Sequence, residues 1–175
     1  MDLLGTMFSA GNGRAVSEIA HRLGLSDGDA RKLIGTLAPA LGQGIAKKSA
    51  DPANLNDLLK ALKSGNHERF LDDPAQTVSD SGIAEGNKIL GHILGSKDVS
   101  RKLASQAAEQ TGISDSLIKQ MLPMVAALAM SALSKQTSEA GGSESLGGLL
   151  GGLLGGGDNP KVDDLLGMAG KLFGR

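Results

Sequence analysis

LIGTLAPAL at residues 33–41 returns as LIKQMLPMV at residues 117–125, with a proline at the same place in both stretches. Two further pairs of stretches match at similar separations: residues 3–8 with 89–94, and residues 23–27 with 111–115. A repeat of this kind marks each copy as one structural unit. We therefore predict two copies of one helical unit, at residues 3–48 and 89–136. What repeats is apolar spacing, glycine and proline, and no repeated polar set resembles a reaction centre.

Apolar side chains recur every three or four residues in nearly every segment, and no alternating β-branched run occurs, which predicts an all-α fold. Each copy should contain a short helix, then a helix, a turn at Gly24 or Gly112, and a long helix. Pro39 and Pro123 fall inside the long helices, where proline removes one backbone hydrogen bond, so we expect a kink or a break there. The predicted helices are about 2–8, 14–23, 26–48, 55–62, 88–94, 99–111 and 115–135.

The composition excludes several classes of chemistry. The chain has no cysteine, so disulfides and thiolate catalysis are impossible, and aromatic residues make up only 2% of it. Residues 1–140 carry 15 basic and 15 acidic side chains, whereas a general nucleic-acid binder is expected to be basic. The N-terminus lacks a basic signal-peptide region, and the longest apolar run, residues 121–133, is shorter than the roughly 20 residues that span a bilayer. We expect a soluble, cytoplasmic protein.

The C-terminal region changes character after the second copy. Nine of the 17 residues 141–157 are glycine, so residues 139–158 are predicted to be a flexible Gly/Leu-rich linker. Residues 159–175 then predict an amphipathic helix that begins near Pro160. Its apolar stripe is the candidate interaction surface, formed by Val162, Leu165, Leu166, Leu172 and Phe173. The stripe could contact its own domain, a second copy, an unknown protein partner or, peripherally, a membrane surface.

Residues 16–26, followed by a second helix, have the rhythm of a helix-turn-helix, and this gives the rival hypothesis of a DNA-binding regulator. The second helix begins with Asp27 and Asp29, which would face phosphates badly. Packing of two helices across a glycine turn is the stronger interpretation. A cluster of basic side chains on one face would favour DNA; the residues in question are Arg14, Arg22, Arg31, Lys32, Lys47 and Lys48.

Four potential metal ligands, His67, Glu68, Asp72 and Asp73, fall within seven residues. An acid-rich turn of this kind is more often a solvated loop, because a metal site needs side chains that converge in space. His21 and His92 are isolated in the sequence. We therefore predict no catalytic residue, no cofactor site and no metal site, and the protein is not expected to be an enzyme.

Three stretches carry a resemblance to a known family: residues 86–95, the Ala-rich helix ending at residues 111–114, and residues 121–126. Over roughly residues 1–138 the chain resembles the bacterial DUF nine-three-seven family, often grouped with YidB-like proteins, and its Gly/Leu-rich tail is typical of that group. The resemblance implies an all-helical fold and no established activity. The expectation is a domain over residues 1–138 that acts as a non-catalytic interaction or scaffold module.

Overall fold

The computed structural model describes residues 3–64 and 67–139, and every regular element in this part of the chain is helical. The elements are α1 (Leu3–Ser9), η1 (Ala10–Gly13), α2 (Arg14–Leu23), α3 (Asp27–Ser49), α4 (Pro52–Ser64), α5 (Arg69–Asp72), η2 (Pro74–Gln76), α6 (Asp80–Leu94), α7 (Lys97–Thr111) and α8 (Asp115–Glu139). The prediction of an all-α fold is confirmed. The predicted linker and the helix at 159–175, with its stripe of apolar residues, lie outside the described residues.

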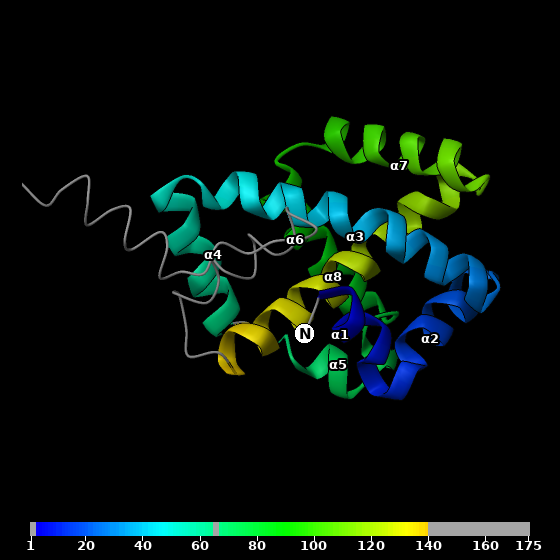
Figure 1. The fold of residues 1–175 in the computed structure, drawn as a ribbon, viewed down its shortest axis with the longest axis horizontal. Coiled ribbons are helices and arrows are strands. Elements are labelled where there is room, and N and C mark those ends of the chain that lie inside the picture. The colour runs from blue at the N-terminus through cyan, green and yellow to red at the C-terminus, as the bar shows by residue number, and fades with distance from the viewer. Residues whose placement is uncertain (1–2, 65–66, 140–175) are drawn as a thin grey trace, which may run out of the picture.

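Helix α8 forms the centre of the molecule (Figure 1). Every residue from Met121 to Ser134 is buried, and α8 packs against all the other α-helices of the described chain. Its many alanines allow these neighbours to approach closely on all sides. By length and composition α8 could cross a membrane, but 78% of its most apolar window is buried inside the fold, as in the core helix of a globular domain.

The turn before each long helix has the expected chemistry. Gly24 after α2 and Gly112 after α7 both adopt left-handed backbone, with φ of 66° and 74°. Ser26 then caps α3, because its hydroxyl accepts a hydrogen bond from the Asp29 amide at 3.1 Å. These residues stop one helix and start the next within three positions.

The predicted start of the helix at residue 88 is wrong. Helix α6 begins at Asp80, because the Ser79 hydroxyl accepts a hydrogen bond from the Gly82 amide at 3.1 Å and caps the first turn. The segment before it is also ordered: α5 and η2 bury Phe70, Leu71 and Pro74. Because this segment is polar, the sequence did not indicate the first two turns of α6, which carry part of the candidate site.

Pro39 and Pro123 occupy corresponding places, inside α3 and α8, and the helix continues through both. Each long helix follows a shorter one that ends at a left-handed glycine. The surroundings of the two long helices differ, because α3 buries one face whereas α8 is buried on all sides from residue 121 to 134. The internal duplication stays a prediction, which superposition of residues 3–48 on residues 89–136 would test.

Candidate binding cleft

A cleft of about 410 Å³ lies between α4 and α6, with α3 and α8 beneath it. Its floor is apolar and consists of Ile45, Leu58, Ala61, Ile89, Ile93 and Met130. Its polar lining consists of Lys48, Asn54, Asp57, His67, Glu85, Lys88 and His92. The volume falls within the range of about 300–1,000 Å³ typical of ligand sites, as does the combination of an apolar floor and a few polar groups.

Two helices present a regular face to this cleft. Helix α4 contributes residues 54, 57, 58 and 61, and α6 contributes residues 85, 88, 89, 92 and 93. Both sets follow the i, i+3, i+4, i+7 spacing that places side chains on one side of an α-helix. The cleft is therefore walled by two helix faces, each with apolar side chains toward the floor and polar ones at the rim.

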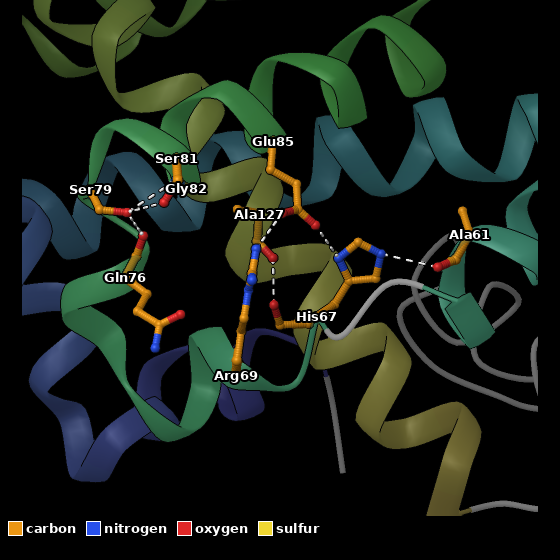
Figure 2. Close-up of polar contacts among 10 residues, drawn as sticks. Ala61, His67, Arg69, Gln76, Ser79, Ser81, Gly82, Glu85 and Ala127 are labelled. Atoms are coloured by element: carbon orange, nitrogen blue, oxygen red, sulfur yellow. Dashed lines mark hydrogen bonds and ion pairs between the residues drawn. The ribbon is translucent and has the colours of Figure 1, made fainter.

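His67 is one of the residues that line the cleft, and its ring lies between Ala61 of α4 and Glu85 of α6 (Figure 2). Its side chain is 7% exposed, and its Nε2 atom lies 3.1 Å from the carbonyl oxygen of Ala61 in α4. A carbonyl only accepts, so Nε2 carries a proton. Its Nδ1 atom lies 3.1 Å from Oε1 of Glu85 in α6, without the alignment of a hydrogen bond. The imidazole thus fills the space between the two walls and fixes their separation at this point.

Glu85 joins His67 to a second basic side chain. Its Oε2 atom accepts a hydrogen bond from the Arg69 guanidinium at 2.5 Å, and this guanidinium also lies over the Phe70 ring, 4.8 Å from the ring centre. Figure 2 shows the Glu85 carboxylate between the Arg69 guanidinium on one side and the His67 ring on the other. The charge of the carboxylate is therefore balanced within the fold. Among the described residues, the rim charges without an ion-pair partner are those of Lys48, Asp57 and Lys88.

The structure separates the four residues that sequence spacing grouped as potential metal ligands. Glu68, Asp72 and Asp73 are exposed, whereas His67 is buried and points to Glu85. Glu68 accepts from the Ser138 hydroxyl at 3.1 Å, and Asp73 accepts from the Gln76 side chain, also at 3.1 Å. Within residues 3–64 and 67–139, no group of three or more acidic, histidine or cysteine side chains is placed to hold a metal ion.

Sequence reasoning missed the contact between His67 and Glu85. The two residues are 18 positions apart, and Glu85 was placed before the predicted helix rather than on it. The signal that could have found the helix is Ser79 followed by Asp80, a combination typical of a helix N-terminus. The partner of His67 carries no such signal, because only the packing of α6 on α8 brings it there.

The helix-turn-helix candidate is formed by α2 and α3, and the exposed side chains at the start of α3 all have contacts within the fold. Asp27 accepts from Ser17 at 2.8 Å, and Asp29 accepts from Ser26 at 2.8 Å. The Arg31 guanidinium lies over the Phe8 ring at 5.6 Å, and the Lys32 ammonium donates to the carbonyl oxygen of Thr111 at 3.4 Å. These side chains therefore make contacts within the protein at the place where a DNA-binding helix would direct them outward to base edges.

The basic residues named as a test for DNA binding are spread out. Lys47 and Lys48 lie at the far end of α3 from Arg31 and Lys32, about 22 Å along the helix axis. Arg22 pairs with Asp80, with 3.6 Å between the charged groups. Lys48 lines the cleft, whereas Lys47 does not.

The fold and the cleft define an all-α domain built around one central helix, with a candidate binding cleft at one side. The family model described as "Bacterial protein of unknown function (DUF937)" matches residues 5–136, and the chain belongs to that family. No curated protein and no solved structure matches the chain significantly. The matched region covers the described helices almost completely and stops before the tail.

Proposed function

We propose that this bacterial protein is a non-catalytic interaction module whose α4–α6 cleft receives an amphipathic helix of a partner protein. The observation that carries the proposal is the pairing of two helix faces, residues 54–61 and 85–93, over one apolar floor. Recognition of a helix in a groove uses this arrangement, with apolar anchors at helical spacing entering the groove. The cleft volume suits a few such anchors rather than a whole helix.

The energetics of the cleft favour an occupant that is apolar on one side. Burial of one large apolar side chain stabilises a complex by roughly 1.5–3 kcal/mol when it is complete. Ile89, Ile93 and Met130 already form the buried floor, so an incoming side chain would meet packed apolar atoms. The charges of Lys48, Asp57 and Lys88 surround this floor, and charges at a rim select orientation and partner more than they add affinity.

The non-catalytic part of the proposal rests on the contacts that the polar groups of the cleft make within the protein. His67 and Glu85 are the closest approach to an acid–base pair at the cleft. His67 contacts Ala61 through one ring nitrogen and Glu85 through the other, and Glu85 also holds Arg69. Both side chains are therefore committed to joining α4, α5 and α6, which is a structural task.

The alternative is a DNA-binding regulator that uses α2 and α3, since these helices do form a pair across a glycine turn. We rank it lower for two reasons. Helix α3 is packed against α2, α4, α6, α7 and α8, so much of its surface is covered. Two of its exposed N-terminal side chains are acidic, which opposes the approach of phosphates.

The proposal includes a cytoplasmic location. It is supported by the burial of 78% of the most apolar window of α8, because most of that helix is covered by protein in the folded domain. Fractionation of host cells tests it: recovery in the membrane pellet after a high-salt wash would contradict this part of the proposal.

Affinity capture of the full chain from host extract, with mass spectrometry of the bound proteins, tests the function. Two variants with reversed rim charge, Asp57→Lys and Lys88→Glu, should lose the captured protein. The matched controls are Asn56→Lys and Lys97→Glu, which alter exposed positions on α4 and α7 outside the cleft. Equal capture by the rim variants and their controls would contradict the proposal.

A further inference from the structure

We propose that, in the free protein, the α4–α6 cleft is occupied in cis by residues 160–173 of the same chain, with the N-terminal end of that segment toward Lys48. This inference rests on the proposed function, because it assigns an occupant to the same cleft. It makes the tail a competitor, so that a partner helix must displace it before binding.

The described chain ends close to the cleft. The Ser134 hydroxyl, in the last turns of α8, donates to the Leu62 carbonyl oxygen in α4 at 3.4 Å, and Ser138 donates to Glu68 beside His67. Residues 140–159 separate this point from the segment. As a Gly-rich coil, 20 residues reach about 25 Å on average. The cleft-facing stretch of α6, from Glu85 to Ile93, is about 12 Å long, so the segment reaches either end of the cleft.

The apolar stripe of the segment matches the spacing of the cleft. Leu165 and Leu166, followed by Leu172 and Phe173, lie seven residues apart, which is two turns or about 10 Å of helix. This is close to the length of the cleft-facing stretch of α6. A cleft of about 410 Å³ accepts several such side chains, since it is more than ten times the volume of about 30 Å³ that one water occupies.

Charge complementarity sets the direction of the segment. Lys48 lies beside Gly95 at the end of α6, so it marks the end of the cleft opposite His67. Lys88 lies on the α6 wall, and neither lysine has an ion-pair partner among the described residues. Asp163 and Asp164 stand at the start of the tail segment, and Lys171 stands near its end. Placing the two aspartates near Lys48 and Lys88 leaves Lys171 toward Glu85.

Because the chain has no cysteine, pairs of engineered cysteines test the inference in the full chain. Asn54→Cys, on the exposed rim of α4, is combined with Lys161→Cys and treated with a short bismaleimide. The matched control combines Lys161→Cys with Gln106→Cys, an exposed position on α7 away from the cleft. We expect intramolecular cross-linking of the first pair to be roughly tenfold faster, since docking raises the local concentration above that set by the tether alone.

Charge exchange provides the second readout. Lys48→Glu with Lys88→Glu should reduce the faster rate to that of the control pair, and adding Asp163→Lys with Asp164→Lys should restore it. Equal rates for the two cysteine pairs in the unaltered background would overturn the inference. Cross-linking mainly between differently tagged chains would overturn it in favour of a second copy. If the rates are equal but capture still depends on Asp57 and Lys88, only the tail assignment fails and the proposed function stands.

Discussion

Gly86 of α6 lies directly against Pro123 of α8: a Cβ atom placed on Gly86 would lie 2.0 Å from the carbonyl oxygen of Pro123 and 2.6 Å from its carbonyl carbon. The obstacle is backbone in the middle of the central helix, so it cannot move aside as a flexible side chain would. This contact sets how closely α6 approaches the core, and α6 forms one wall of the cleft.

Gly86→Ala should therefore destabilise the protein. The added methyl group must push α6 away from α8, and we expect a loss of about 2–3 kcal/mol in the free energy of unfolding. Urea unfolding followed by circular dichroism measures it. Gly91→Ala is the control on the same helix, because Gly91 is exposed and a Cβ there meets nothing within 4 Å. The control variant should gain up to about 1 kcal/mol in the free energy of unfolding, because alanine has the higher helix propensity. Equal losses in both variants would show that the close approach of Gly86 to Pro123 does not limit stability.

Removal of the Glu85 carboxylate should weaken the link between α5 and α6. Glu85→Ala removes the hydrogen-bond acceptor of the Arg69 guanidinium and the carboxylate beside the His67 ring. We expect a loss of about 1–2 kcal/mol, moderated because Glu85 and Arg69 are partly exposed to solvent. Thermal and urea unfolding provide the measurement. Glu109→Ala, at an exposed position of α7, should change stability by less than about 0.5 kcal/mol. A loss no greater than that of the control would show that the contacts contribute nothing.

No sequence-specific DNA binding is expected. The described domain carries no basic cluster at the start of α3, and the exposed basic residues there contact Phe8 and Thr111. A mobility shift with genomic fragments at about 50 mM salt is a generous test, because low salt strengthens contacts to phosphate. Binding that resists competitor DNA, and that Arg31→Ala abolishes, would favour the rival function.

The sequence predicts the architecture well where apolar spacing and capping residues agree. Helix α2 begins at Arg14 and ends at Leu23 as predicted, because Gly24 stops it and Ser26 caps the next helix. The start of α6 was missed because two glycines and several polar residues reduce the local helix propensity of residues 80–88. Packing decides there: Gly82 and Gly86 are buried and permit close approach to Gln76 and Pro123.

The candidate cleft could not be predicted from the sequence. It depends on helices from four parts of the chain, and only the fold brings Ile45, Leu58, Ile89 and Met130 together. The grouping of His67 with Glu68, Asp72 and Asp73 was misleading, because closeness in the sequence did not become convergence in space. The apolar stripe of residues 162–173 stays a prediction.

Site-specific photo-cross-linking in living host cells tests the central claim most directly. A photoreactive amino acid is placed in the full chain at Asn54 on the cleft rim, at Arg31 on α3, and at Gln106 on α7. The account predicts adducts with another protein from position 54, well above those from position 106, and none with nucleic acid from position 31. Adducts with nucleic acid from position 31, with position 54 no more reactive toward other proteins than position 106, would contradict it.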